Sequence, residues 1–133
     1  MSTLQYYNYP GTEKNSRKFH YSQAVKIGST VKTSGQGGWD AEGTIVTKTE
    51  EQVAKTFDNV QKALQAVDAR LSWKNVYAVR SYHTNVSETF DMATANFKAR
   101  MPDHAPVWTC VEIPKLGLEG MVIEIEVEAV ISG

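Results

Sequence analysis

The residues best able to do chemistry in this chain lie in two segments near its C-terminal end. Residues 106–111 are Pro-Val-Trp-Thr-Cys-Val, and residues 122–126 are Val-Ile-Glu-Ile-Glu. Side chains of an extended strand alternate between two faces, so Trp108 and Cys110 are expected to share one face. Glu124 lies on the polar side of the second strand. The pattern predicts an indole, a thiol and a carboxylate on a sheet face that a ligand can reach.

Glu124 has the clearest chemical role among these candidates. Partial burial beside an apolar ring disfavours the ionised carboxylate and raises its pKa, which suits a general acid or base near neutral pH. The alternative is a structural glutamate that bonds a neighbouring backbone or lysine. Cys110 fits a packed small residue better than a nucleophile, because no basic partner is fixed beside it. Tyr21 either donates a hydrogen bond to a ligand or packs at an interface.

Composition narrows the class of protein. The 133 residues suffice for one domain, and the 14 basic and 15 acidic side chains leave a net charge of −1, which argues against a nucleic-acid partner. The single cysteine and the spacing of His20, His83 and His104 predict no metal site, and no cofactor is expected. The sequence has no apolar run of about 20 residues and no signal pattern, so a cytoplasmic protein without a membrane partner is expected.

Hydrophobic periodicity predicts the elements that position these residues. Residues 1–18 show no clean period and are expected to form an N-terminal arm or irregular segment. Short β-prone runs follow at 19–27 and 30–34, separated by a Gly-Ser turn. An apolar stripe at helical spacing predicts the clearest helix, with Thr49 and Gln52 as a capping box. The stripe consists of Val53, Phe57, Val60, Leu64, Val67 and Leu71.

The second half of the chain predicts a strand at 76–84, a helix ending before Pro102, and strands at 106–113 and 121–131. The resulting fold class is α+β, a mixed β-sheet with two helices on one face. The other sheet face carries apolar side chains among its glutamates. Such a face is commonly buried against another subunit, although a solvated face is the alternative.

A glycine-rich segment at residues 35–40 must form a turn or loop. Its backbone is free to approach a ligand closely, because glycine has no Cβ. A plain connection between elements is the alternative interpretation.

Five motifs together resemble one family, the Rid proteins (reactive intermediate deaminases, YjgF-like, formerly called L-PSP endoribonucleases). The resemblance runs from about Phe19 to Ile131, and the motifs occur in the family's order and spacing. It implies a chorismate-mutase-like fold and a homotrimer with a ligand cleft at each subunit interface. The motifs are Tyr21-Ser22-Gln23-Ala24-Val25, Thr33-Ser34-Gly35-Gln36, Asn59-Val60, Thr109-Cys110-Val111-Glu112 and Ile123-Glu124-Ile125-Glu126.

The well-studied members hydrolyse 2-imino or enamine acids to ammonia and a 2-oxo acid. By resemblance, Glu124, Cys110 and Tyr21 are the expected catalytic residues. The expected substrate-binding residues are Ser34, Gly35, Gln36, Gly37, Trp39, Trp108 and Thr109.

One position departs from the family pattern. Trp108 stands where the family has an arginine that clamps the substrate carboxylate. A guanidinium offers two charge-assisted hydrogen bonds, whereas an indole offers one neutral donor. A standard 2-imino acid is therefore not the expected substrate, unless Arg80, Lys32 or Arg100 replaces the clamp.

Two functions from different classes remain open. The first is an enzyme that performs hydrolytic or acid–base chemistry on an imine, an enamine or a related carbonyl compound. The second is a non-catalytic trimer that binds a metabolite or a protein in the same cleft. Ribonuclease activity is less favoured, because rows of acidic side chains repel a phosphate backbone.

Overall fold

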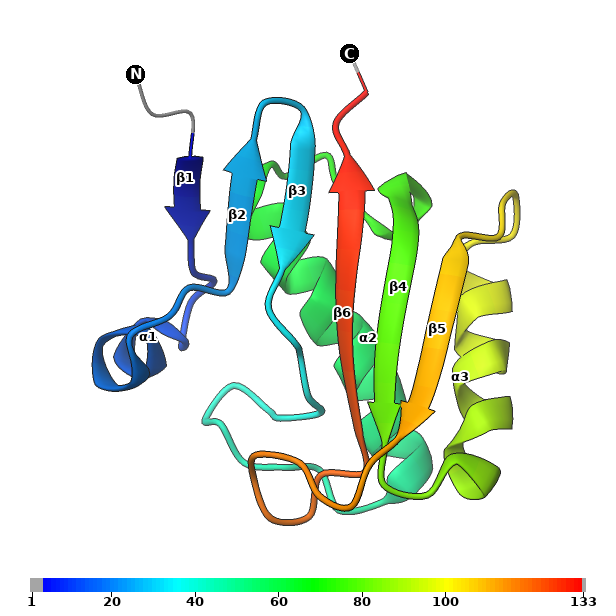
Figure 1. The fold of residues 1–133 in the computed structure, drawn as a ribbon. Coiled ribbons are helices and arrows are strands. Elements are labelled where there is room, and N and C mark those ends of the chain that lie inside the picture. Colours follow the sequence, from blue (N-terminus) through cyan, green and yellow to red (C-terminus); the bar gives the residue numbers. More distant parts are fainter. Residues whose placement is uncertain (1–3, 133) are drawn as a thin grey trace.

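A computed structural model describes residues 4–132 as one mixed sheet with helices packed against it (Figure 1). The sheet order is β1-β2-β3-β6-β4-β5, with β4 and β5 parallel and the other neighbours antiparallel. The strands are β1 (Leu4–Tyr7), β2 (Ala24–Ile27), β3 (Thr30–Thr33), β4 (Val76–His83), β5 (Val107–Glu112) and β6 (Ile123–Val130). The helices are α1 (Glu13–Phe19), α2 (Thr49–Val67) and α3 (Val86–Arg100), with a short 3-10 helix η1 (Trp73–Asn75).

The core lies between the sheet and the helices α2 and α3, which cover the same sheet face (Figure 1). The α2 stripe is buried as its spacing predicts, and an aromatic cluster joins α2, η1 and α3. In that cluster the Phe57 ring centroid lies 4.9 Å from that of Trp73 and 5.2 Å from that of Phe97. Facing it, β6 buries Ile123, Ile125, Val127 and Ala129.

The predicted fold class, an α+β mixed sheet with two helices on one face, is confirmed. The helix predicted from the apolar stripe is α2, and it ends earlier than the stripe does. The helix stops at Val67, and Leu71 is buried in the turn beyond it. The capping box is wrong. Lys48 occupies the N-cap position and makes no capping hydrogen bond with its side chain, and Gln52 instead bonds two loops. Within the described residues, no helix is long and apolar enough to cross a membrane.

Residues 4–19 depart most from the sequence expectation. Residues 4–7 form β1 on the outer edge of β2, and residues 13–19 form α1, so this segment is not irregular throughout. Phe19 ends α1 rather than beginning a strand. The helix α1 buries none of its own residues and stands beside the sheet in Figure 1. A helix that buries no apolar stripe shows no periodicity by which to predict it.

The prediction that Trp108 and Cys110 lie on the sheet face that a ligand can reach is wrong. In the parallel pair, Trp108 lies beside Val79 and Cys110 beside Ser81. Both β4 residues are buried on the helix-covered face, and directly paired residues share a face. Glu124 belongs to the opposite, open face of β6, where it pairs with Tyr82. The indole and the thiol therefore lie on the other side of the sheet from the carboxylate.

Candidate functional site

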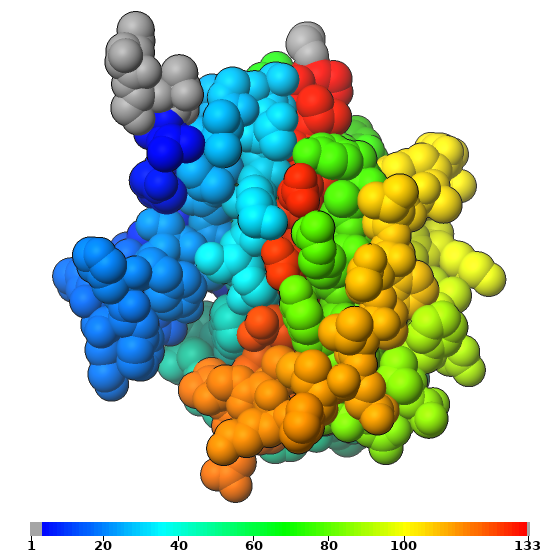
Figure 2. Space-filling model, in the orientation of Figure 1, coloured from blue at the N-terminus to red at the C-terminus, as the bar shows by residue number. Residues whose placement is uncertain are grey.

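A large cleft of about 830 Å³ lies beside the end of β3. Its walls come from α1 and the turn before it, the loop after β3, one face of α2, the loop before β6, and β6 itself. A hollow between α1 and the segment after β3 is visible in Figure 2. The residues that matter for chemistry there are Tyr9, Lys14, Lys18, Tyr21, Ser34, Gly35, Trp39, Lys62, Met121 and Glu124.

Glu124 is the carboxylate of this cleft. It is half-buried on β6, and an added Cβ on Gly35 would overlap its carboxylate group. Burial raises the pKa of Glu124, and the nearby charge of Glu126 raises it further. A carboxyl group with a raised pKa can both donate and accept a proton near neutral pH. The glycine at position 35 therefore leaves the room that the carboxylate occupies.

The glycine-rich loop is held against α2, as a loop that shapes a site must be. The Asn59 side chain donates to the carbonyl of Gly37 at 2.8 Å and to that of Trp39 at 2.9 Å. Added Cβ atoms would meet the Met121 and Trp39 side chains at Gly37, and the backbone of α2 at Gly38. The loop thus lies as close to its neighbours as glycine allows, and it presents the Trp39 ring to the cleft.

A chain of hydrogen bonds runs behind the wall of the cleft. The Trp39 indole donates to the Tyr9 hydroxyl at 2.9 Å, and this hydroxyl donates to Gln36 Oε1 at 2.7 Å. Gln36 Nε2 donates to Gln23 Oε1 at 2.7 Å, and Gln23 Nε2 donates to the Tyr21 hydroxyl at 3.3 Å. The Gln36 side chain is fully buried and committed to this network, so within one chain it does not line the cleft.

Tyr9 is a site residue that sequence reasoning missed, as it missed Met121 and the three lysines of the cleft. Three tyrosines lie at positions 6, 7 and 9, and only Tyr9 is buried, at 5% exposure. Burial raises its pKa, so its hydroxyl keeps its proton. The sequence offers no periodicity to separate this tyrosine from its neighbours. Its nearness to Pro10 and Gly11, which mark a turn, is the only local hint.

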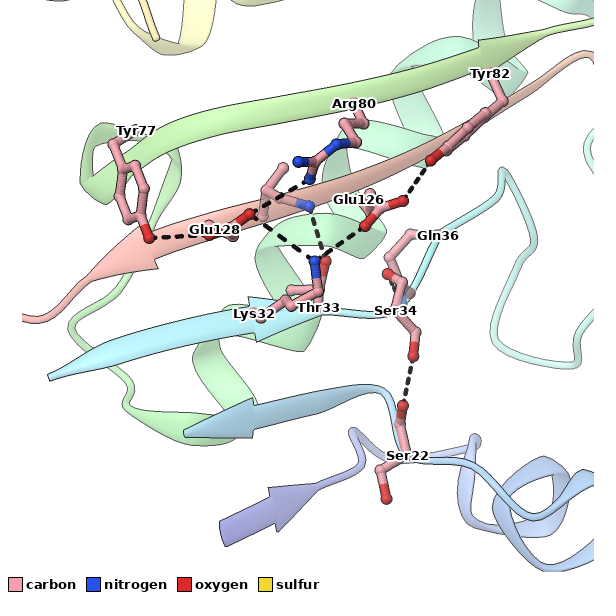
Figure 3. A network of polar contacts seen from close by, with 11 residues as sticks. Ser22, Lys32, Thr33, Ser34, Gln36, Tyr77, Arg80, Tyr82, Glu126 and Glu128 are labelled. Atoms are coloured by element: carbon pink, nitrogen blue, oxygen red, sulfur yellow. Dashed lines mark hydrogen bonds and ion pairs between the residues drawn. The ribbon is translucent and has the colours of Figure 1, made fainter. Parts of the chain in front are cut away.

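Tyr21 and Ser34 stand where the large cleft meets a shallower cavity of about 390 Å³ on the open sheet face. The Ser34 hydroxyl donates to the carbonyl of Ser22 at 2.7 Å, a bond drawn in Figure 3. The shallow cavity also includes Lys32 and Glu126.

Four side chains surround the two remaining glutamates of β6 (Figure 3). Glu126 accepts hydrogen bonds from Tyr82 at 2.6 Å and from Lys32 at 3.3 Å. Burial opposes ionisation of Glu126, but these bonds outweigh it and lower its pKa. Glu128 accepts from Tyr77 at 3.1 Å and from Arg80 at 3.4 Å. Adjacent glutamates of one strand therefore have opposite pKa shifts, and the raised one lies in the cleft.

The cations expected to replace the missing arginine are engaged elsewhere. Lys32 and Arg80 contact the β6 glutamates, and Arg100 pairs with Asp58 at 2.8 Å. None of the three lines the large cleft. The cations that do line it are Lys14, Lys18 and Lys62, and no ion pair between described residues includes them.

The predicted residues of β5 lie apart from this cleft in a single chain. Trp108 stacks on Phe90 of α3 with ring centroids 5.1 Å apart and contacts Phe97 edge-on at 4.7 Å. Half-buried Cys110 shares that face, and exposed Thr109 lies on the open face. The strands β6 and β4 separate β5 from β3 and the loop that follows it. Of the described residues of β5, none lines either cavity.

A buried polar chain continues from Trp108. Its indole donates to Ser81 Oγ at 2.9 Å, and Ser81 Oγ lies 2.8 Å from His83 Nε2. His83 Nδ1 lies 2.6 Å from Thr89 Oγ1, which donates to the carbonyl of Asn85. Each group then has a partner if His83 carries its proton on Nδ1. Burial lowers the pKa of His83, so this chain joins β4 to α3 as a neutral network.

The described residues contain no group of three His, Cys, Asp or Glu side chains placed to hold a metal ion. The arrangement in the cleft instead suits proton transfer. It combines a carboxyl group with a raised pKa, a tyrosine hydroxyl, an indole ring and lysine cations.

Comparisons with known proteins agree with this fold. Residues 13–131 match the model of the Endoribonuclease L-PSP family. The RutC family protein YjgH of Escherichia coli K12 is 32% identical over 110 residues, which cover 82% of this chain and 81% of that protein. A solved structure of protein YJGH covers 99% of both chains with a TM-score of 0.85 and 26% identity.

A structure of E. coli TdcF with bound serine is similar over 84% of this chain and 88% of that chain, with a TM-score of 0.73 and 28% identity. The family match spans most of the chain, and it agrees with the resemblance to Rid proteins seen in five sequence motifs. The chain therefore belongs to the Endoribonuclease L-PSP family, the family of YjgF-like proteins.

Proposed function

We propose that this protein hydrolyses an imine or an enamine of a small molecule, with Glu124 as the group that transfers protons. The observation that carries the proposal is the half-buried Glu124 carboxyl group, which lines a large cleft and has a raised pKa. A raised pKa increases the protonated fraction of the carboxyl group at a given pH, which favours a residue that must donate as well as accept a proton.

The steps balance with Glu124 alone. Its protonated carboxyl group gives a proton to the imine nitrogen, or to the β-carbon of an enamine, and an iminium ion forms. A water molecule attacks the iminium carbon and passes a proton to the Glu124 carboxylate. The carbinolamine takes this proton on nitrogen and the C–N bond breaks. Ammonia leaves, and the protonated carbonyl product returns a proton to Glu124.

A homotrimer is part of the proposal. In one chain the cleft has Glu124 and Tyr21, while Cys110 and Thr109 lie on the far edge strand of the sheet. The resemblance to Rid proteins implies that β5 of a neighbouring subunit completes each cleft. Val107, on that edge strand, is 71% exposed in the single chain, which supports burial there by another subunit.

The proposed substrate is not a standard 2-imino acid held by an arginine. Trp108 faces α3, and the cleft offers lysine ammonium groups, which act as point charges without the planar fork of a guanidinium. The Trp39 ring adds an apolar surface. The bound serine of TdcF supports a small amino-acid-like ligand. In this chain we place a ligand of different shape beside Trp39 and the lysines of the cleft.

Ammonia release from freshly generated 2-aminoacrylate and from its primary amide tests the proposal. We expect release above the uncatalysed rate for at least one of them, and a loss of roughly 100-fold or more in Glu124→Gln. A second variant, Trp108→Arg, restores the family residue. Activity on the acid only in this variant would mean that the catalytic groups are intact and tuned to another substrate.

Unchanged turnover in Glu124→Gln would overturn the proposed role. Ligand binding without turnover, equal in the parent and in Glu124→Gln, would instead favour the non-catalytic binding module. Cleavage of a single-stranded RNA by the parent, measured in parallel, would favour the activity after which the family is named.

A further inference from the structure

The N-terminal segment supplies a residue to the cleft that the family model does not include. Tyr9 precedes the matched residues 13–131, yet it is buried and lines the cleft. Its hydroxyl is the junction between the Trp39 indole, at 2.9 Å, and Gln36 Oε1, at 2.7 Å. A plain packing role for Tyr9 would not require two short polar contacts.

The direction of each hydrogen bond in this chain is fixed by chemistry. An indole N–H only donates, so the Tyr9 oxygen accepts from Trp39, and the Tyr9 proton goes to Gln36 Oε1. The Gln36 amide nitrogen must then face Gln23 Oε1 and the carbonyl of Ser34. This contact in turn fixes the Gln23 amide.

This series of hydrogen bonds ends on Tyr21. Gln23 Nε2 donates to the Tyr21 oxygen at 3.3 Å, so that oxygen is an acceptor within the chain. The Tyr21 proton is not used within this chain of bonds, and the Tyr21 side chain, which is 37% exposed, lines both cavities. The proton is therefore available to an acceptor on a ligand.

Burial fixes the orientation of the groups in this series of hydrogen bonds. Gln23 and Gln36 are fully buried and Tyr9 is 5% exposed. Flipping the Gln23 amide alone would leave two donors facing each other, and flipping the Gln36 amide alone would leave two acceptors facing each other. Such a mismatch removes hydrogen bonds from groups that water cannot reach. Tyr9 also keeps its proton at any ordinary pH, because burial raises its pKa.

We propose that Tyr9 is a positioning residue that acts through Gln36 and Gln23 to direct the Tyr21 hydroxyl proton into the cleft that holds Glu124. The expected effect of Tyr9 on turnover rests on the proposed function. The expected effect of Tyr9 on the Tyr21 hydroxyl does not. A substrate with an acceptor atom beside its C=N or C=C group is the partner that such a donor suits. The N-terminal segment then contributes a functional residue, Tyr9, to the site.

Tyr9→Phe tests the inference, because it removes only the hydroxyl and keeps the ring. Tyr7→Phe is the matched control, since the Tyr7 hydroxyl makes a single exposed contact of 3.5 Å with Gln5. The first measurement needs no ligand. The ¹³Cζ resonance of Tyr21, assigned by its loss in Tyr21→Phe, is expected to shift in Tyr9→Phe and to stay in place in Tyr7→Phe. An unmoved Tyr21 resonance in Tyr9→Phe would overturn the inference.

The second measurement is a double-mutant cycle on ammonia release from 2-aminoacrylate or its amide. We expect Tyr9→Phe and Tyr21→Phe each to lower kcat about tenfold with little change in KM, and the double variant to lose no more than Tyr21→Phe alone. Losses that multiply would show that Tyr9 does not act through Tyr21. An inactive parent would count against the proposed function, and the resonance of Tyr21 would then decide the inference alone.

Discussion

Two neighbouring glutamates show how strongly local contacts set the chemistry of this protein. Glu126 is bonded by a tyrosine and a lysine, which lower its pKa. Two residues earlier, Glu124 forms no ion pair with a cation in the part of the chain that the structure describes, and its burial raises its pKa. Strand alternation places both on the same side of the sheet, so their difference comes from what surrounds each carboxylate.

The raised pKa of Glu124 predicts a pH-dependent gain in stability for Glu124→Gln. Below the pKa of the unfolded chain both states are protonated, and the variant and the parent should be equally stable. As the pH rises through the higher pKa of the folded state, the parent alone carries a partly desolvated charge. We expect a gain of roughly 0.5 kcal/mol for the variant at pH 8, discounted for partial exposure.

Urea unfolding of both proteins at pH 4 and pH 8 measures this difference. A gain of equal size at both pH values would trace the effect to packing instead of charge. A loss at pH 8 would mean that the carboxylate makes stabilising contacts in the folded state.

Gly35→Ala should separate activity from stability. An added methyl group would overlap the Glu124 carboxylate, the flexible end of a side chain that can turn away at little cost. We expect the free energy of unfolding to change by less than about 1 kcal/mol, and ammonia release to fall by tenfold or more as the proton-transferring group moves. Gly117→Ala is the matched control, because it also lines the cleft and its Cβ would meet open space.

Equal activity in Gly35→Ala and Gly117→Ala would show that the position of Glu124 is not critical. A large loss of stability in Gly35→Ala would show that the loop, and not the carboxylate, absorbs the methyl group.

The sequence singled out five of the residues that meet in the cleft, although their roles stay predictions. Tyr21, Ser34, Gly35, Trp39 and Glu124 line it together. Tyr21, Ser34, Gly35 and Glu124 belong to motifs that were recognised by their order and spacing, and Trp39 belongs to the glycine-rich segment. Tyr9 was missed because one buried tyrosine among three has no periodicity to mark it.

The sheet face of Trp108 could not be predicted from β5 alone. A six-residue strand with apolar residues on both sides alternates equally well in either orientation, and only pairing with β4 decides which side meets the helices. The apolar residues of β6 alternate strictly with glutamates, so the core face of that strand was predicted correctly.

At the level of elements, α2 organises the site as well as the core. Gln52 is 1% exposed near the start of the helix, and its amide group joins three backbone positions. Nε2 donates to the carbonyls of Val46 and Gly120 at 2.8 and 2.9 Å, and Oε1 accepts from the amide of Val122 at 2.7 Å. One side chain thus fixes the loop after β3 and the loop before β6 on the same helix.

Gln52→Leu should therefore be strongly destabilising. It keeps a similar volume but leaves three partly buried backbone groups without their present partners, at a cost on the order of 3 kcal/mol. Gln65→Leu, on the exposed surface of the same helix, should change stability by no more than about 0.5 kcal/mol. Guanidinium unfolding of the two variants measures both values, and a small effect at Gln52 would mean that water replaces the lost bonds.

The contact between β5 and α3 makes Trp108 a structural residue within one chain. Its ring stacks on Phe90 and meets Phe97 edge-on, and its indole donates to buried Ser81. We expect Trp108→Ala to cost roughly 2 to 3 kcal/mol and Trp108→Phe, which keeps a ring but loses the hydrogen bond, about 1 kcal/mol. Thermal unfolding of both variants, combined with Phe90→Ala in a double-mutant cycle, measures the stacking energy. A coupling near zero would show that the two rings contribute independently.

This structural role bears on the missing arginine. Because Trp108 helps to hold α3 on the sheet, restoring arginine there removes packing as well as adding a charge. Activity of Trp108→Arg must therefore be compared at a temperature where both proteins are folded.

The whole molecule has a sheet with one covered face and one open face, and this asymmetry argues for assembly. The helices α2 and α3 cover the buried face (Figure 1), as the ribbon shows. The open face combines the glutamates of β6 with apolar residues of β5. Val107 and Val111 are 71% and 38% exposed there. A mixed face with exposed valines on an edge strand is a common site of subunit contact.

Val107→Asp tests whether that face is an interface. Light scattering should give three times the 14.8 kDa chain mass for the parent and a smaller mass for the variant, because a buried aspartate without a partner opposes association. Ala69→Asp, at an exposed position in the turn after α2, should keep the parent mass. If the variant becomes monomeric and also loses activity while its chain stays folded, the cleft needs β5 of a neighbour. If the parent itself is monomeric, the catalytic residues must all come from one chain, and Cys110 and Thr109 lose their place in the site.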